Sequence, residues 1–283
     1  MKRAALLLVS ILLVAAASES VGTSARDLGT AIGGQVADGH RRAPVVVIVM
    51  ENHNYGEIVG NGDAHYLNNR FIPAGRLFTN YHAIEHPSLP NYLAMTSGTT
   101  SGCHSNDCPV RHFRTNNIFH QLAHSGRGWR TYAEGMPSRC ALEDSGRYVV
   151  HHNPPPYYRK LRGLPCRRFD RPYPTPLPSR LVAFTFVVPD ECHDMHDCSV
   201  AAGDRWLRHH VPALLNRGAI VVITFDEASD SNSNRVLTAA VGPGIRAGVR
   251  RGELTHYSLL AGIEVHFGLG RLHHARDARV LHL

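Results

Sequence analysis

Acidic, amide and histidine side chains follow three strongly apolar segments of this 283-residue chain. They occupy residues 51–53, 190–197 and 226–227. Continuous apolar, β-branched segments are typical of strands buried on both faces, as in a parallel sheet. The carboxyl ends of such strands meet at one edge of the sheet, where ligands bind. Carboxylate oxygens and imidazoles gathered there predict a site for a divalent cation.

A serine with a potential chemical role lies in the segment 85–98. Ser88 precedes Pro90, and proline is favoured in the first turn of a helix. We therefore expect Ser88 just before a helix N-terminus, where free backbone N–H groups and the helix dipole favour an anion. Beside a divalent cation, its hydroxyl can lose its proton and attack phosphorus. The alternative is that Ser88 only caps the helix.

The elements that must position these residues alternate between strands and helices, which predicts an α/β fold. We expect a mostly parallel central sheet with helices on both faces. Strands are predicted over residues 45–50, 183–188 and 219–225, with weaker ones over 129–133 and 236–241. Helices are predicted over residues 91–97, 116–125, 201–216 and 257–267. The Pro- and Arg-rich stretch 153–179 is interpreted as an ordered surface excursion held by Cys166.

Composition places the chain among ordinary globular proteins. With 43% hydrophobic and 19% charged residues it is neither a disordered chain nor a coiled coil or fibre. The formal net charge is +7, which would attract anionic substrates or membrane faces. Four arginines form a basic patch that either meets an anionic membrane or is simply solvated: Arg159, Arg162, Arg167 and Arg168. No nucleic-acid recognition motif is present, so we expect no nucleic-acid partner, and we expect a monomer.

The N-terminus has the pattern of a secretory signal. Lys2 and Arg3 precede an apolar run that ends in small residues near Ala17. We therefore expect a signal peptide over 1–17, a flexible leader over 18–42 and a single domain over 43–283. The protein is predicted to be secreted or periplasmic.

All six cysteines lie beyond that signal, and an even number in an exported chain favours disulfides. Cys192 and Cys198 are the best candidates for one pair because they are close in the sequence. The competing interpretation is a Cys/His zinc site that also uses His193 and His196.

Several ordered motifs resemble the bacterial phosphoesterase family, which contains secreted acid phosphatases and non-specific phospholipases C. These motifs are residues 50–55, 86–92, 194–197 and 225–227. The resemblance extends from about residue 44 to about residue 270 and is greatest to the small secreted acid phosphatases that act on phosphoinositides. The family belongs to the alkaline phosphatase superfamily, so the resemblance implies an alkaline-phosphatase-like sheet.

The resemblance also implies roles for individual residues. Ser88 matches the nucleophile, His152 and His196 look like phosphate-facing or acid–base histidines, and Asn91 is expected to bind substrate. The implied metal ligands are Glu51, Asn52, Asp226 and Glu227, with Asp190 and Asp194 as a second pair and His256 as a further ligand. Oxygen ligands alone would suit Ca²⁺, Mg²⁺ or Mn²⁺, whereas His256 favours Zn²⁺. The number of bound metal ions stays open.

Together these features predict an exported, metal-dependent phosphohydrolase of the acid phosphatase type. It would cleave small phosphomonoesters or phospholipid headgroups, phosphoinositides among them, through a seryl nucleophile. One alternative is a phosphodiesterase of the phospholipase C type. The other is a non-catalytic exported protein that binds a metal or an anion. Peripheral contact with an anionic membrane fits the basic charge.

Overall fold

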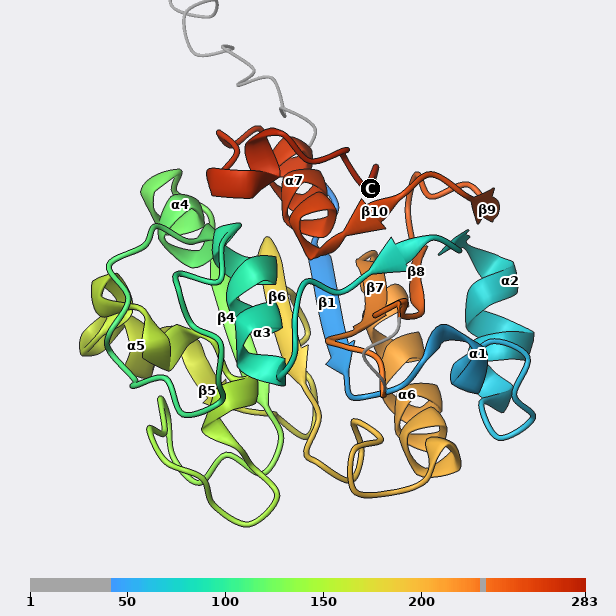
Figure 1. Ribbon diagram of the computed structural model, residues 1–283, viewed down its shortest axis with the longest axis horizontal. Helices are drawn as coiled ribbons and strands as arrows, with labels where there is room; N and C mark the ends of the chain where they lie inside the picture. Colours follow the sequence, from blue (N-terminus) through green and yellow to red (C-terminus); the bar gives the residue numbers. More distant parts are fainter. Residues whose placement is uncertain (1–41, 230–232) are drawn as a thin grey trace, which may run out of the picture. The chain divides into compact units, whose positions relative to one another are not determined.

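The core is an eight-stranded sheet with the strand order β5-β4-β6-β1-β7-β8-β2-β9 (Figure 1). Pairing is parallel from β5 through β7 and again between β2 and β9, while β8 runs antiparallel to both of its neighbours. The prediction of a mostly parallel sheet is therefore confirmed. The strands are β1 (Val45–Met50), β2 (Arg76–Phe78), β4 (Trp129–Ala133), β5 (Asp170–Pro172), β6 (Phe184–Val188), β7 (Ile220–Phe225), β8 (Thr238–Val241) and β9 (Gly248–Arg250).

This architecture comes from a computed structural model, which describes residues 42–229 and 233–283. The signal peptide expected over 1–17 and nearly all of the expected leader lie outside the described residues. Residues from Arg42 to Leu283 form one compact unit. A separate two-stranded parallel ladder pairs β3 (Tyr81–His82) with β10 (Leu254–Thr255).

Helices cover the sheet because its central strands are apolar on both faces. Every residue of β1, β6 and β7 is buried. Helix α3 is buried along its whole length and packs against α7 in front of the sheet in the view of Figure 1, while α6 packs on β7. The α-helices are α1 (Tyr55–Ile58), α2 (Ile72–Ala74), α3 (Ser88–Ser97), α4 (Ile118–His124), α5 (Leu164–Phe169), α6 (Val200–Leu215) and α7 (His256–Phe267).

Five short helical segments of other types also occur in the described part of the chain. Two of them, η3 and η4, lie in the Pro- and Arg-rich stretch. They are η1 (Leu67–Phe71), η2 (Val150–His152), η3 (Pro155–Tyr157), η4 (Arg159–Leu161) and η5 (His273–Arg276).

The structure corrects several expectations about local elements. Helix α3 begins at Ser88, three residues earlier than the predicted start at Asn91. The last predicted strand is shorter and antiparallel. The stretch 153–179 is more than a surface excursion, because it contains α5 and supplies β5, an edge strand of the central sheet.

Three disulfides join the six cysteines: Cys103–Cys108, Cys140–Cys166 and Cys192–Cys198. The predicted pair Cys192–Cys198 is confirmed. A sulfur atom held in a disulfide is not available as a zinc ligand, so the competing Cys/His zinc site is wrong. Among the described residues, no helix is both long enough and apolar enough to cross a bilayer.

Candidate active site

The carboxyl ends of β1 and β7 bring Glu51 and Asp226 side by side. Met50 pairs with Phe225 in the parallel register, and the backbone N–H of Asp226 donates to the carbonyl of Met50 at 2.9 Å. Asn52 follows with a φ of 48°, a left-handed conformation that asparagine tolerates better than most residues. This turn lets the backbone N–H of Asn52 donate to Asp226 Oδ1 at 3.2 Å. Two adjacent strand ends thus fix the first carboxylates of the site.

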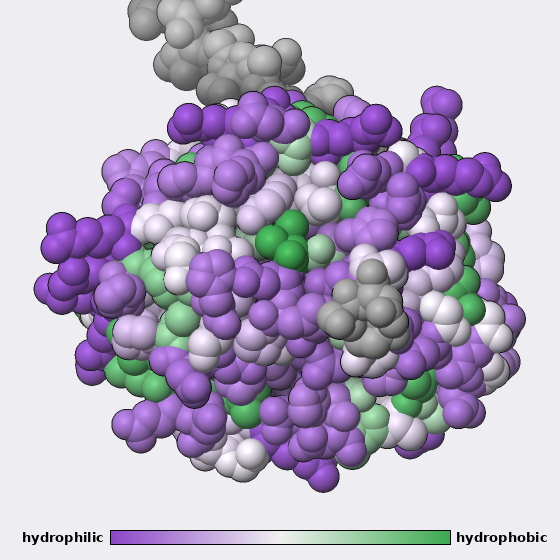
Figure 2. Space-filling model, viewed as in Figure 1, coloured by the Kyte–Doolittle hydropathy of each residue, from purple (hydrophilic) through white to green (hydrophobic). Residues whose placement is uncertain are grey.

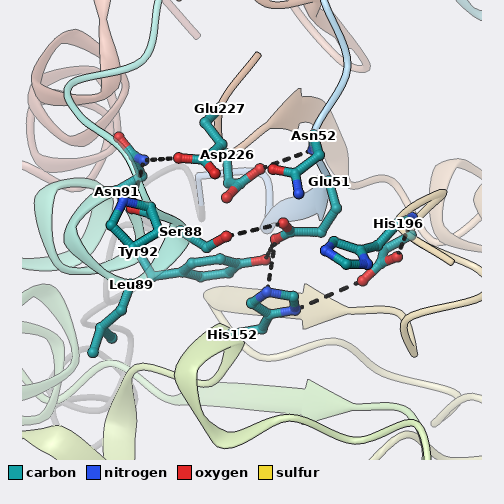
Figure 3. A network of polar contacts seen from close by, with 12 residues as sticks. Glu51, Asn52, Ser88, Leu89, Asn91, Tyr92, His152, His196, Asp226 and Glu227 are labelled. Carbon is teal, nitrogen blue, oxygen red and sulfur yellow. Dashed lines mark hydrogen bonds and ion pairs between the residues drawn. The ribbon is translucent and has the colours of Figure 1, made fainter. Parts of the chain in front are cut away.

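Helix α3 points its N-terminal residues at Glu51 (Figure 3). Ser88 Oγ donates to Glu51 Oε2 at 3.3 Å, and one turn later the hydroxyl of Tyr92 donates to Glu51 Oε1 at 2.5 Å. The N-cap position belongs to Pro87, so Ser88 does not cap the helix. Its hydroxyl is instead directed into the carboxylate cluster.

His152, at the end of η2, closes the opposite side of this cluster. Its Nε2 lies 3.4 Å from Glu51 Oε1, and its Nδ1 lies 3.7 Å from Asp194 Oδ2. The ring stacks on Tyr92 with centroids 5.2 Å apart. Glu51, His152 and Asp194 are all buried and their ligand atoms could surround a metal ion.

Glu227 lies on the other side of Asp226 and faces residues near the start of α3. Asn91 Nδ2 donates to Glu227 Oε2 at 3.3 Å, and His86 Nδ1 lies 3.1 Å from the same oxygen. The carbonyl oxygen of the Asn91 amide accepts the backbone N–H groups of Ile84 and Glu85. Asn91 therefore links the segment before Ser88 to Glu227.

His256, the first residue of α7, lies behind Asp226. Its Nε2 donates to the backbone carbonyl of Asp226, so its Nδ1 must accept from the hydroxyl of Tyr81 at 3.0 Å. Burial lowers the pKa of His256 to about 4, which keeps the ring neutral. Both ring nitrogens are engaged in this arrangement, and the side chain supports the backbone of Asp226.

Asp190 and His196 lie at the margin of this arrangement. Asp190 lies in a group with Glu134 and His193. Asp190 Oδ1 accepts a hydrogen bond from the backbone N–H of His193. The Nδ1 atom of His193 lies 2.9 Å from Glu134 Oε2. His196 is partly exposed, with its Nδ1 2.8 Å from Asp197 and its ring centroid 6.5 Å from that of His152. The expected pair Asp190 and Asp194 is therefore divided between two groups.

The electrostatics of the buried carboxylates are unusual. Burial, together with neighbouring Asp226 and Asp194, raises the pKa of Glu51 well above its ordinary value. Burial raises the pKa of Asp194 to about 9 and that of Asp226 to about 6. Burial and the charge of Asp226 raise the pKa of Glu227 to about 9. Removing a carboxylate from water disfavours its charged form, and each charged neighbour adds to that cost.

Several polar atoms of this cluster have no hydrogen-bond partner although they are buried. They are Asn52 Oδ1, Asp194 Oδ2, Asp226 Oδ2 and both ring nitrogens of His152. Buried polar atoms are nearly always paired in proteins, so a group of them calls for a specific explanation. Oxygen and imidazole donors with no partner fit a bound divalent cation.

Two residues that contact the site were not among the predicted site residues. Tyr92 had the pattern of a core residue, and its contact with Glu51 depends on how α3 is oriented. His86 lies in the motif 86–92, so its position two residues before Ser88 was the available signal.

Comparisons with known proteins place this chain in a defined class. The fold is similar to that of a protein in the alkaline phosphatase superfamily from Vibrio parahaemolyticus, with a TM-score of 0.53 at 10% identity over 83% of this chain and 70% of that one. Residues 66–270 match the model of the Phosphoesterase family, and the chain belongs to that family. It is a hydrolase that acts on phosphoric esters.

Two curated relatives bear names that agree with this class. The chain is 32% identical to the phosphatidylinositol-3-phosphatase of Mycobacterium tuberculosis over 83% of its own length and 80% of that protein. It is 29% identical to the phosphate-repressible acid phosphatase of Penicillium chrysogenum over 70% of this chain. That match spans 53% of the fungal protein, about half of its length.

Proposed function

We propose that the protein is an exported, metal-dependent phosphomonoesterase that uses Ser88 as its nucleophile. The observation that carries the proposal is the hydrogen bond from Ser88 Oγ to Glu51 within a cluster of buried carboxylates that have unpartnered oxygen atoms. A structural serine would not need so many acidic neighbours. A catalytic serine does, because it must lose a proton and act beside a cation.

Glu51, Asn52, Asp226 and Glu227 are the residues that we assign to hold a divalent cation, with Asp194 and His152 adjoining them. When bound, such an ion neutralises developing negative charge and lowers the pKa of the attacking hydroxyl. The oxygen donors favour Ca²⁺, Mg²⁺ or Mn²⁺, whereas the nitrogen donors of His152 favour Zn²⁺. The arrangement of His256 supports a positioning role for it, because both of its nitrogens already have partners.

The protein's own residues supply the nucleophile, the proton acceptor and the proton donor. Ser88 Oγ attacks phosphorus in line and its proton passes toward Glu51 Oε2, the atom that accepts its hydrogen bond. The alcohol leaves with a proton supplied by partly exposed His196, because the neutral ring of His152 has no acidic proton to donate. Burial, followed by the charges of His151 and His196, lowers the pKa of His152 well below its ordinary value. Water finally hydrolyses the phosphoseryl intermediate.

The finer expectations about substrate and location belong to the same proposal. The name of the mycobacterial relative supports phosphoinositide headgroups as one class of substrate. Three disulfides support an oxidising location outside the cytoplasm, as does the N-terminal sequence pattern. We expect the protein to act as a monomer and to have no nucleic-acid partner.

The test is hydrolysis of p-nitrophenyl phosphate by the purified protein and by Ser88→Ala, from acid to alkaline pH, with and without EDTA. Loss of the nucleophile should lower kcat by about 10³-fold or more. Ser97→Ala is the matched control, because Ser97 is also buried, lies at the other end of α3 and donates to the backbone carbonyls of Leu93 and Thr99, away from the carboxylate cluster. It should keep most of the activity.

The other candidate functions are distinguished in the same assay. Preference for bis-p-nitrophenyl phosphate over the monoester would identify a phosphodiesterase. Full activity in Ser88→Ala would remove the serine from the mechanism. Absence of turnover with each of the four divalent ions, together with tight binding of one of them, would identify a binding protein.

A further inference from the structure

The short helix α5 presents the most exposed large hydrophobic side chain among the described residues. Leu164 begins this helix and is 81% exposed. It follows Gly163, whose φ of 81° turns the chain sharply outward before the helix. A large apolar side chain held in water at a fixed place is a candidate for contact with an apolar partner.

Basic side chains surround Leu164 on both sides in the sequence. Residues 159–169 contain five exposed basic residues and no acidic one: Arg159, Lys160, Arg162, Arg167 and Arg168. Figure 2 shows strongly hydrophilic side chains gathered on the side where Figure 1 places α5. Within the ranges that the structure describes, none of the five forms an ion pair with a carboxylate. Their charges are therefore available to an external anion.

A second segment adds to this basic surface. The backbones of Phe113 and Tyr158 pair through an isolated β-bridge, and the N–H of Arg159 donates to the carbonyl of Phe113. This pairing brings Arg114 beside the segment. A shallow, open depression of about 380 Å³ is lined by Arg114, Arg159, Lys160 and Arg162.

The surface is firmly attached to the core. Leu161 and Cys166 are buried on either side of Leu164, and Cys166 is tied to Cys140 by a disulfide. The chain then continues directly into β5 of the central sheet. Leu164 and its basic neighbours are thus held outward by a rigid base, so little conformational freedom would be lost on binding.

We infer that Leu164 and the basic residues Arg114, Arg159, Lys160, Arg162, Arg167 and Arg168 form a docking surface for an anionic lipid bilayer. Guanidinium and ammonium groups are attracted to anionic headgroups, each by roughly fivefold in affinity. The leucine distinguishes a bilayer from a soluble anion, because a small anion offers nothing apolar for it to contact. A bilayer provides both partners, anionic headgroups at its surface and acyl chains beneath them. This surface goes beyond the proposed catalytic function and does not depend on it.

The experiment is sedimentation of the purified protein with vesicles of phosphatidylcholine, with and without phosphatidylserine. Binding should require phosphatidylserine and weaken with added salt. Leu164→Ser should weaken it by about tenfold, the lower end of what burying a leucine contributes. Arg167→Gln with Arg168→Gln should weaken it by roughly 25-fold, at about fivefold per charge.

The matched control is Arg250→Gln with Arg251→Gln, which removes the same charge at β9, on the opposite edge of the sheet from β5. It should stay within about twofold of the unaltered protein, because those charges lie outside the docking surface. Equal loss in both double variants would reduce the effect to net charge and overturn the proposal. Unchanged binding of Leu164→Ser, or no binding of the unaltered protein, would overturn it too.

Turnover of p-nitrophenyl phosphate should be the same in Leu164→Ser and in the unaltered protein, which shows that the variant is folded. Because Ser88→Ala should still bind the vesicles, loss of docking and loss of catalysis are separate results. A protein that docks but hydrolyses nothing would leave this inference standing and contradict the proposed function alone.

Discussion

Two groups of carboxylates with a histidine lie near the same edge of the sheet, and they differ in how their charges are satisfied. The inner cluster contains Glu51, His152 and Asp194, with Asp226 beside Glu51, and the outer cluster contains Glu134, Asp190 and His193. The inner residues are buried and have unpartnered atoms. In the outer cluster, the carboxylate of Glu134 accepts hydrogen bonds from the indole N–H of Trp206 and the backbone N–H of Asp190. The carboxylate of Asp190 accepts from two backbone N–H groups.

The comparison teaches that ligand-type residues alone do not define a metal site. Both clusters satisfy the same geometric condition for holding an ion. In the outer cluster, however, hydrogen-bond donors and partial exposure already stabilise the negative charges. In the inner cluster the carboxylates are fully buried, and the donors that reach Glu51, Asp194 and Asp226 leave Asp194 Oδ2 and Asp226 Oδ2 without a partner. A bound cation would offset the cost of burying these carboxylates together. We therefore expect the same kind of substitution to have a large effect in the inner cluster and a small effect in the outer cluster.

Removing one carboxylate from each cluster should give the largest difference. Glu51→Gln removes the negative charge of a proposed metal ligand and replaces one of the two oxygens that accept from Ser88 and Tyr92 with an NH₂ group, so kcat should fall by about 10²- to 10³-fold. Glu134→Gln should change kcat by less than about threefold, because its group has no reacting partner. Steady-state kinetics on p-nitrophenyl phosphate measures both. Comparable losses in the two variants would mean that the outer cluster also takes part in the reaction.

Metal binding should stabilise the protein through the inner cluster alone. At about 100 times its dissociation constant, a bound ion raises the free energy of unfolding by ~2.7 kcal/mol. Thermal denaturation after EDTA treatment and metal addition should show this gain in the unaltered protein and in Asp190→Asn. Asp226→Asn should lose it. If no divalent ion raises the melting temperature of the unaltered protein, its inner carboxylates are neutralised by protons instead.

The sequence predicted the sheet well where its strands are long and apolar. Segments such as 219–225 read as buried strands because packing on both faces demands continuous apolar residues. The edge strands β5 and β9 and the strand β2 beside β9 could not be predicted, since each is three residues long and is defined by its neighbours in space. The antiparallel direction of β8 likewise depends on how the chain returns after β7, which no local pattern encodes.

The candidate site could be anticipated at the strand ends but not in its internal grouping. Glu51 and Asp226 follow adjacent parallel strands, so their proximity is a consequence of topology. Asp190 and Asp194 are close in sequence and yet belong to different clusters. The chain turns between them, and the Cys192–Cys198 disulfide closes this loop. Backbone N–H groups of the folded loop then donate to each carboxylate and fix its orientation. Spacing along the chain cannot resolve such a division.

The support behind Asp226 should have a smaller effect than the cluster itself. Tyr81 holds His256, and His256 holds the backbone carbonyl of Asp226. Tyr81→Phe removes one hydroxyl and should lower the affinity for the divalent ion about tenfold, as is common for residues that position ligands. Isothermal titration with the metal measures this. Tyr173→Phe, which removes a hydroxyl bonded to His210, is the control and should leave the affinity unchanged.

The smallest expected effect concerns Asp170, a buried carboxylate that lies beside Asn153 and the Cys140–Cys166 disulfide and not in a group of carboxylates. One oxygen accepts from Asn153 at 3.0 Å, and the other has no partner. Burial raises the pKa of Asp170 from 3.8 to about 8. A proton alone is sufficient to neutralise this carboxyl group, because no second carboxylate adds its charge. The folded protein therefore keeps the proton of Asp170 in a pH range where the unfolded chain, in which this carboxyl has its ordinary pKa of 3.8, has already released it.

This proton determines whether the stability of the protein rises or falls with pH. Its stabilising contribution is complete below the pKa of the unfolded chain and is lost as the pH rises toward about 8. Asp170→Asn removes the titration, so between about pH 5 and pH 7 the stability of the variant relative to the unaltered protein should increase by about 1 kcal/mol per pH unit. Urea denaturation at several pH values measures this difference.

Asp204→Asn provides the contrast for that experiment. Asp204 is also buried, but its two oxygens accept the backbone N–H groups of Tyr66 and Leu67 at 2.7 and 2.9 Å. An amide cannot accept both bonds, so the substitution should destabilise the protein throughout this pH range, by about 1–3 kcal/mol. Buried carboxylates would then divide by what satisfies them: backbone donors at Asp204, a proton at Asp170 and a cation in the inner cluster. If the difference in the free energy of unfolding between Asp170→Asn and the unaltered protein does not vary with pH, Asp170 is not neutralised by a proton and this classification is wrong for it.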